Sequence, residues 1–183
     1  MSLDTFNILI GIGTLAIAFF TLVLIIFRLA IGEHSHILNI VRRNTLPLGF
    51  IIGISAIGGS LIYSEIYNLT PCLFCWWQRI FLYPQVIIFA IAWYRHGRNN
   101  TAGYDIFHYS TPLAVIGSCI SLYHVFLQQG VIAGTGACLQ NGVSCTTIDI
   151  SIFGFLTIPM MALILGIALS LLGLFVLKNK KTA

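Results

Sequence analysis

Five long apolar runs alternate with short polar connections along the whole sequence. The runs cover residues 6–27, 46–63, 75–94, 111–129 and 152–177. Each is close to the ~20 residues that a helix needs to cross the hydrocarbon core of a bilayer. The connections leave no room for an independent soluble domain. The pattern therefore predicts an all-α integral membrane protein with five spans.

Composition and the first run agree with this interpretation. Only 8% of the 183 residues are charged, whereas 58% are hydrophobic, and a soluble domain of this size could not hide so much apolar surface. The chain begins Met1-Ser2-Leu3-Asp4, without the basic leader of a signal peptide. Since the first run is also long enough to span, we expect residues 6–27 to be a retained transmembrane helix.

The basic residues predict the orientation. With five spans, eight of the nine fall on one side of the membrane: Arg28, Arg42, Arg43, Arg95, Arg98, Lys178, Lys180 and Lys181. The positive-inside rule makes that side the cytoplasm, so we expect no nucleic-acid partner. The N-terminus, residues 64–71 and residues 130–151 are then outside, and the C-terminus is inside. The ninth basic residue, Arg79, lies alone near the outer end of its span.

Small residues recur at four-residue spacing in two of the runs. Gly49 and Gly53 share this spacing in the second run, and Ala162, Gly166 and Ser170 share it in the last. Such spacing lets helix backbones approach closely in lipid. It predicts close helix contacts at these positions, although apolar spans are also rich in glycine by chance.

A Cys-x-x-Cys pair opens the third run. Cys72 and Cys75 are followed by Arg79, one helical turn or about 6 Å from Cys75. A dithiol of this kind serves redox chemistry or binds a metal. A guanidinium and a helix start both favour the thiolate form of Cys75. The alternative is that Arg79 extends to the lipid headgroups and Cys75 is an ordinary thiol.

His124 lies about five residues inside the outer end of the fourth run, at a depth similar to that of Arg79. Two polar groups at matched depth on different helices indicate one site, large enough for a ligand with carbonyl oxygens. The alternative is a histidine that only hydrogen-bonds a neighbouring helix.

A second cysteine pair lies in the outer loop of residues 130–151. Cys138 and Cys145 flank the turn signal Asn141-Gly142, so they can approach and close a small ring. A disulfide in an exposed loop is open to a partner's thiolate, and a structural disulfide is the alternative. The six-residue separation does not fit the usual zinc knuckle, so we expect no metal. Cys119, alone in the fourth run, is expected to be a packing residue.

Together these motifs resemble the DsbB family of bacterial disulfide-forming membrane proteins. The resemblance lies in Pro-Cys-x-x-Cys-x-x-x-Arg at 71–79, His-x-x-x-Gln at 124–128, the outer cysteine pair, and Phe-Gly-Phe-x-x-x-Pro at 153–159. The short cysteine loop is similar to the BdbC-type branch. The similarity divides the chain into an extra N-terminal helix and loop (1–45), a four-helix transmembrane bundle (46–177) and a basic cytoplasmic tail (178–183).

The resemblance implies a protein-disulfide-forming quinone oxidoreductase of the bacterial inner membrane, with its cysteines on the extracytoplasmic face. It would reoxidise a DsbA-like thioredoxin-fold thiol oxidase and pass the electrons to ubiquinone or menaquinone. Cys138 would be attacked by the partner, and Cys145 would pass electrons to Cys72. Cys75 would face the quinone, with Arg79 and His124 beside it.

Two other functions stay open from the sequence. One is a non-enzymatic membrane scaffold held by structural disulfides or by zinc. The other is an enzyme with the reverse electron flow, similar to vitamin K epoxide reductase. The helix at residues 6–27 is additional to the four helices of the family, and the outer loop is shorter than in its better-known members.

Overall fold

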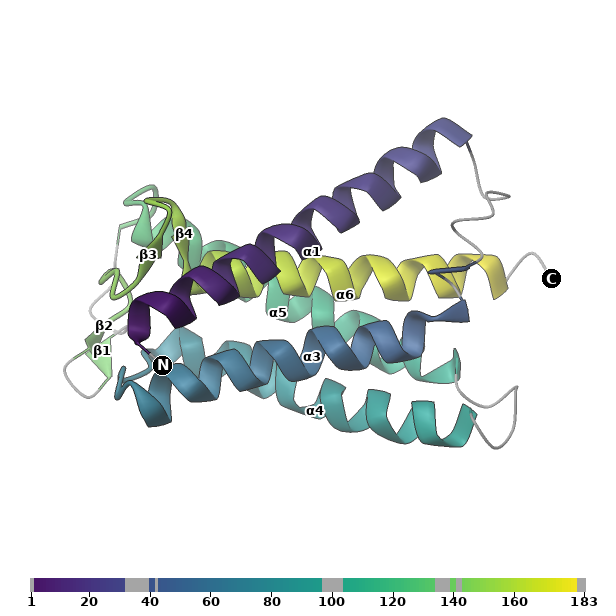
Figure 1. Ribbon diagram of the computed structural model, residues 1–183, viewed down its shortest axis with the longest axis horizontal. Coiled ribbons are helices and arrows are strands. Elements are labelled where there is room, and N and C mark those ends of the chain that lie inside the picture. Colours follow the sequence, from purple (N-terminus) through teal and green to yellow (C-terminus); the bar gives the residue numbers. More distant parts are fainter. Residues whose placement is uncertain are drawn as a thin grey trace.

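Five long helices make up most of the protein in the computed structural model. The structure describes residues 2–31, 40–41, 43–96, 104–133, 139–140 and 143–180. The long helices are α1 (Leu3–Ile31), α3 (Thr45–Leu61), α4 (Leu73–His96), α5 (Phe107–Gln128) and α6 (Ile158–Lys180). Each is long and apolar enough to cross a membrane. The predicted all-α membrane fold with five spans is confirmed (Figure 1).

Short elements complete the ends of the helices. The π-helical turn η1 (Ile62–Ile66) prolongs α3, and the 3-10 turn η2 (Tyr104–Ile106) leads into α5. Two small antiparallel hairpins lie between α5 and α6. One pairs β1 (Leu139–Gln140) with β2 (Val143–Ser144), and the other pairs β3 (Ser151–Ile152) with β4 (Leu156–Thr157). Figure 1 shows both hairpins at the end of the bundle that holds the N-terminus.

The last span begins later than the sequence indicates. The apolar run starts at Ile152, but α6 starts at Ile158, because the β3–β4 hairpin takes up the intervening residues. Phe153 (φ 54°) and Gly154 (φ 80°) make its turn. Hydropathy cannot separate an apolar hairpin from a helix. Pro159 does mark the true start, since a proline in the first turn of a helix loses no hydrogen bond.

Small residues bring the helices close together, as their spacing predicts. A Cβ on Gly49 would lie 2.6 Å from the ring of Phe89, and one on Gly53 would lie 2.8 Å from Val86. Both contacts join α3 to α4. On α6, a Cβ on Gly166 would lie 2.5 Å from Ser118 of α5. These positions therefore allow no larger side chain without movement of the neighbouring helix.

Helix α1 crosses the bundle obliquely and packs mainly against α6 (Figure 1). At its start, the ring of Phe6 stacks edge-on against Tyr63 of η1, with centroids 5.1 Å apart. Gly11 lies against Ile152 of the β3–β4 hairpin. At its end, the Arg28 guanidinium lies 4.6 Å from the ring centroid of Phe175 on α6.

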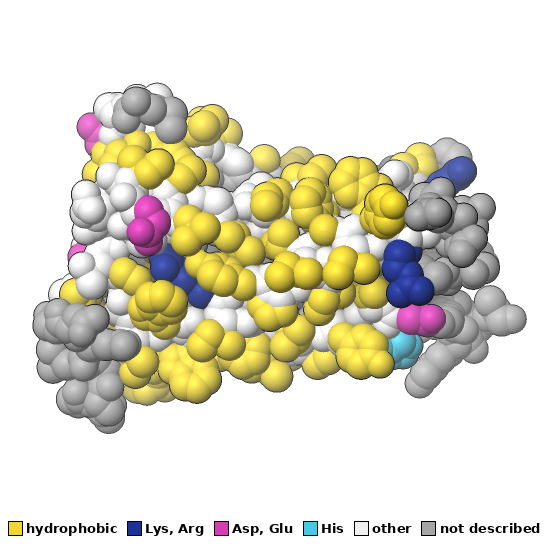
Figure 2. Space-filling model, turned by 90° about the horizontal axis from the view of Figure 1, so that it is seen from below, with side chains coloured by type: hydrophobic (Ala, Val, Ile, Leu, Met, Phe, Trp, Pro, Cys, Tyr) yellow, Lys and Arg dark blue, Asp and Glu magenta, His cyan; other side chains and the backbone are white. Residues whose placement is uncertain are grey.

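The outer surface of the helices is apolar, as expected for a lipid-facing surface. Figure 2 shows a broad belt of hydrophobic side chains between two ends that carry charged groups. Exposed hydrophobic residues of the long helices include Leu9, Phe19, Ile51, Ile87, Trp93 and Ile116. In water such a surface would be strongly unfavourable, whereas in a bilayer it is matched to its surroundings.

Candidate functional site

The Cys-x-x-Cys pair lies where the connection from η1 enters α4. Cys72 precedes the helix by one residue and Cys75 is in its first turn. Both are free cysteines, and their Sγ atoms are 3.1 Å apart. A disulfide has an S–S distance of about 2.05 Å, so a shift of about 1 Å in a side chain closes the ring. The pair is in position to cycle between dithiol and disulfide.

His124 on α5 connects this pair to the outer loop. Its Nε2 lies 3.6 Å from Cys72 Sγ and 3.2 Å from the carbonyl oxygen of Cys145. Its Nδ1 lies 3.4 Å from the amide nitrogen of Gln78. An amide nitrogen can only donate, so this orientation of Gln78 assigns the acceptor role to Nδ1 and the proton to Nε2. His124 then donates towards the loop carbonyl and towards Cys72.

The surroundings of Cys72 favour its thiolate. The pKa of Cys72 is lowered to about 4, chiefly by the hydrogen bond with Cys75 and also by the interaction with His124, while burial acts in the opposite direction. A thiolate is the nucleophile in thiol–disulfide exchange. The sequence places the activated thiolate at Cys75, next to Arg79, whereas the hydrogen bond from His124 goes to Cys72.

Cys145, a member of the second predicted cysteine pair, lies beside Cys72 and His124. This residue is disulfide-bonded and is buried. Its Sγ, Cys72 Sγ and a ring nitrogen of His124 all lie within 4.8 Å of one another. The side-chain amide of Gln128 donates to the carbonyl of Thr147 (2.9 Å) and so fixes the loop beside α5. Cys138, the other member of the predicted pair, lies outside the described residues.

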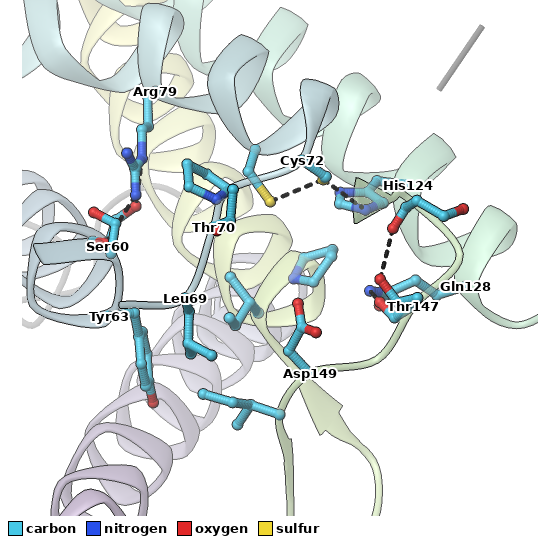
Figure 3. Close-up of a pocket in the computed structure, with 17 residues that line it drawn as sticks. Ser60, Tyr63, Leu69, Thr70, Cys72, Arg79, His124, Gln128, Thr147 and Asp149 are labelled. Atoms are coloured by element: carbon cyan, nitrogen blue, oxygen red, sulfur yellow. Dashed lines mark hydrogen bonds between the residues drawn. The ribbon is translucent and has the colours of Figure 1, made fainter. Parts of the chain in front are cut away.

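Arg79 lies on the opposite side of the pair from His124 (Figure 3). Its Nε donates to Ser60 Oγ and its Nη2 to the Ser60 carbonyl, both at 2.9 Å. Its guanidinium is also 5.3 Å from the ring centroid of Trp76. Only 6% of the residue is exposed. Arg79 therefore points into the protein and does not extend to the lipid headgroups.

Two cavities border Cys75 and Arg79. An outer cavity of about 50 Å³ is lined by Cys72, Cys75, Arg79, His124 and residues of the 144–150 loop segment. Figure 3 shows this cavity between Arg79 on one side and His124 on the other. A larger cavity of about 210 Å³ lies among α1, α3, α4 and α6, and its lining includes Cys75 and Arg79 but neither Cys72 nor His124. Cys75 therefore faces both cavities, and Cys72 faces only the outer one.

The site also contains potential metal ligands. Cys72, His124 and Cys145 form the one such group among the described residues. Zinc binds cysteine as thiolate, and the sulfur of Cys145 is engaged in a disulfide. These residues fit a metal only after that disulfide is reduced.

Sequence reasoning missed two residues that organise the site. Ser60 holds Arg79, and Gln78 holds His124. Gln78 carried a usable signal, since an uncharged amide within an apolar run needs a hydrogen-bond partner. Ser60 carried none, because serines in membrane helices commonly bond their own backbone, as Ser55 does here.

The fold and the site together define a multi-pass membrane protein in which a Cys-x-x-Cys pair and the disulfide-bonded Cys145 come together at one end of the bundle. Comparison with known proteins gives the family. The family model described as disulfide bond formation protein DsbB matches residues 42–176. The chain belongs to the DsbB family, and its role is disulfide formation at a membrane.

Relatives of the chain carry the same description. It is 43% identical to a probable disulfide formation protein C 1 of Bacillus anthracis, over 67% of this chain and 84% of the relative. It is 38% identical to the disulfide bond formation protein C of Bacillus subtilis (strain 168), over 75% of this chain and 94% of the relative. A probable disulfide formation protein of Metapseudomonas resinovorans is 30% identical over 140 residues, 76% of this chain and 92% of the relative. No solved structure matches the chain significantly.

Proposed function

We propose that this protein reoxidises an extracytoplasmic thioredoxin-fold thiol oxidase of the DsbA type and passes the electrons to a membrane quinone. One observation carries the proposal: Cys72 Sγ is within 4.8 Å of Cys145 Sγ, whereas Cys75 opens onto the large cavity within the membrane. In sum, one partner dithiol and one quinone would become one partner disulfide and one quinol.

Electrons would enter at the disulfide that contains Cys145. The partner's thiolate attacks this disulfide, at Cys138 if the family order holds, and Cys145 leaves as a thiolate. Cys145 then attacks Cys72 in the Cys72–Cys75 disulfide and releases Cys75 as a thiolate. A second partner thiolate resolves the partner–Cys138 disulfide and releases Cys138 as a thiolate. Cys138 then attacks Cys145 in the Cys145–Cys72 disulfide, which restores the Cys138–Cys145 disulfide and releases Cys72 as a thiolate, so each exchange forms one S–S bond and breaks one. The Cys72 and Cys75 thiolates would then give two electrons to a bound quinone, which takes up two protons, and would reform their own disulfide.

His124 and Gln78 would support the exchange at Cys72. Nε2–H of His124 donates to Cys72 Sγ when that sulfur carries negative charge, and the same group holds the carbonyl of Cys145 nearby. Gln78 fixes the ring through Nδ1. We therefore assign His124 to the exchange step between the two pairs. Its contact with a quinone ring stays a prediction of the family resemblance.

The large cavity fits a quinone headgroup. Its walls are mainly apolar, and its polar groups gather near Cys75: Ser60, Tyr63, Gln78 and Arg79. The guanidinium has five N–H donors, and its hydrogen bonds to Ser60 engage Nε and Nη2 only. A further N–H of Arg79 can donate to a carbonyl oxygen beside Cys75. A quinone bound there would supply the acceptor for two electrons and two protons.

The test of the proposal is quinone reduction by purified protein. Wild type, supplied with a reduced DsbA-type partner and menaquinone or ubiquinone, should oxidise the partner's thiols and lose quinone absorbance at equal rates. Cys75→Ser should abolish quinone reduction. Cys119→Ser is the matched control and should behave as wild type, because Cys119 is a free, exposed cysteine outside both cavities.

Two results would contradict the proposal. Turnover by Cys75→Ser would remove Cys75 from the electron path. A wild-type protein that oxidises no dithiol partner with either quinone would remove the quinone-linked function altogether.

A zinc-binding scaffold is the second function to be tested, because three potential ligand atoms lie within 4.8 Å. It predicts bound zinc after purification under reducing conditions. A scaffold held by structural disulfides instead predicts cysteine pairs that resist mild reductants. Metal analysis together with thiol counting in graded reductant separates it from the redox function.

A further inference from the structure

We propose that α1, the helix additional to the family's four-helix bundle, forms the membrane-facing wall of the quinone cavity and holds the quinone's isoprenoid tail. This inference rests on the proposed quinone-linked function. The segment matched by the family model begins at residue 42, so α1 lies outside it. The role of α1 must therefore be argued from its contacts.

Helix α1 supplies one side of the cavity that contains Cys75 and Arg79. Its lining residues from α1 are Leu9, Ile10, Gly13, Thr14 and Ile17. The opposite sides come from α3, α4 and α6. Without α1, this side of the cavity would open directly to lipid. The helix thus adds a wall to what would otherwise be a shallower groove on the bundle.

A second cavity continues along α1 towards the other end of the molecule. It measures about 230 Å³ and is lined by Ala16, Ile17, Phe20, Thr21 and Leu24 of α1, with apolar side chains of α3 and α6 opposite. Ile17 lines both cavities. The two cavities are neighbours at Ile17 and together follow α1 from Cys75 and Arg79 to Phe175.

The chemistry of this path changes from one end to the other. Polar side chains gather at the Cys75 end, whereas the far cavity has Thr21 as its one polar residue. Thr14 and Thr21 donate their hydroxyl hydrogens to the carbonyls of Ile10 and Ile17, so α1 presents an almost wholly apolar wall. A molecule with a polar ring and a long hydrocarbon tail matches this division. An acyl chain of a lipid would match only the far part.

Gly13 and Gly58 provide a test and its matched control. A Cβ on either glycine would meet no atom within 4 Å, so both helices accept a side chain there. Gly13 lines the Cys75 cavity, whereas Gly58 lines neither cavity. Gly13→Phe therefore places a ring in the space proposed for the quinone. Gly58→Phe makes the same change outside it.

The experiment measures binding directly, in full-length protein reconstituted in nanodiscs. The probes are a long-tailed menaquinone and menadione, which has the same ring without a tail. Gly13→Phe should bind both roughly tenfold or more weakly than wild type, because its ring overlaps the headgroup space. Ala16→Phe, in the far cavity, should weaken only the long-tailed quinone. Gly58→Phe should bind both as wild type does.

A second measurement separates binding from folding. Disulfide exchange between the two cysteine pairs needs no quinone, so its rate should be the same in all three variants and in wild type. Failure of wild type to bind either probe would overturn the proposed function itself. Wild-type binding that Gly13→Phe and Ala16→Phe leave unchanged would overturn the role of α1 alone. Binding of the long-tailed quinone that Ala16→Phe leaves unchanged, while Gly13→Phe weakens both probes, would overturn the tail-holding role alone.

Discussion

At the scale of single residues, the proposed function gives Cys72 and Cys75 separate tasks. Cys72 contacts His124 and lies close to Cys145, which suits it to the proposed thiol exchange. Cys75 opens onto the membrane cavity beside Arg79. The two sulfurs lie only 3.1 Å apart, so both border the outer cavity, and Cys75 alone also borders the larger one.

Cys72 should remain a thiolate at pH values far below the ordinary thiol pKa. The pKa of Cys72 is lowered from 9.0 to about 4, so lowering the pH from 9 should not protonate it until the pH nears that value. The measurement is the ultraviolet thiolate absorbance of the reduced protein minus that of Cys72→Ser, titrated with pH. Replacing His124 by Phe removes one stabilising hydrogen bond and should move the midpoint upward. A wild-type midpoint near 9 would contradict the geometry.

The sequence predicted the cysteines, Arg79 and His124 as one site, and the structure brings the described ones together. Motif spacing and depth in the membrane suffice for this, because both follow directly from helical geometry. The partners of these residues could not be derived. Whether Arg79 meets Ser60, or His124 meets Gln78, depends on helix rotation, and the sequence does not specify rotation for spans that are apolar on all sides.

At the scale of helices, the contact between α3 and α4 positions Ser60 opposite Arg79. Gly49 and Gly53 allow this contact, because Phe89 and Val86 occupy the space that their side chains would fill. The four-residue glycine spacing predicted a close approach correctly. It could not name the partner helix, since a glycine face has no chemical preference for one apolar neighbour over another.

A methyl group at Gly49 should destabilise this contact. The added Cβ would lie 2.6 Å from the Phe89 ring, and overpacking of this kind costs about 1–3 kcal/mol. Gly58→Ala is the control, since no atom lies within 4 Å of its Cβ. Its effect should be neutral or slightly stabilising. The free energy of unfolding in mixed detergent micelles measures both variants, and equal values would refute the proposed packing.

The β3–β4 hairpin shows where reasoning from hydropathy stops. Residues 152–157 are apolar enough to extend a span, yet they fold back before α6 begins. The positive φ angles of Phe153 and Gly154 set the turn. Gly154 indicates the turn, but glycine is also common within membrane spans, so it does not distinguish a turn from a continuing helix.

At the scale of the whole molecule, the cysteines, His124 and Arg79 of the proposed electron path lie at one end of the bundle. The basic residues predict that this end faces outward. In a cysteine-free background, Val131→Cys should react with a membrane-impermeant maleimide in intact cells, and Arg95→Cys should react only after lysis. Both positions are exposed in the structure. The reverse labelling pattern would invert the proposed orientation.

The packing of α1 against α6 has a consequence for how the protein is made. Chains emerge from the ribosome N-terminus first, so α1 enters the membrane well before its main partner, which is the last helix of the chain. During synthesis of the intervening helices, α1 can pack against lipid, α3 and the η1 turn, but not yet against α6. The cavity beside Cys75 therefore gains its α6 wall only at the end of synthesis. Until α6 has inserted, the nascent protein can carry its cysteines yet lack the complete cavity that we propose for the quinone.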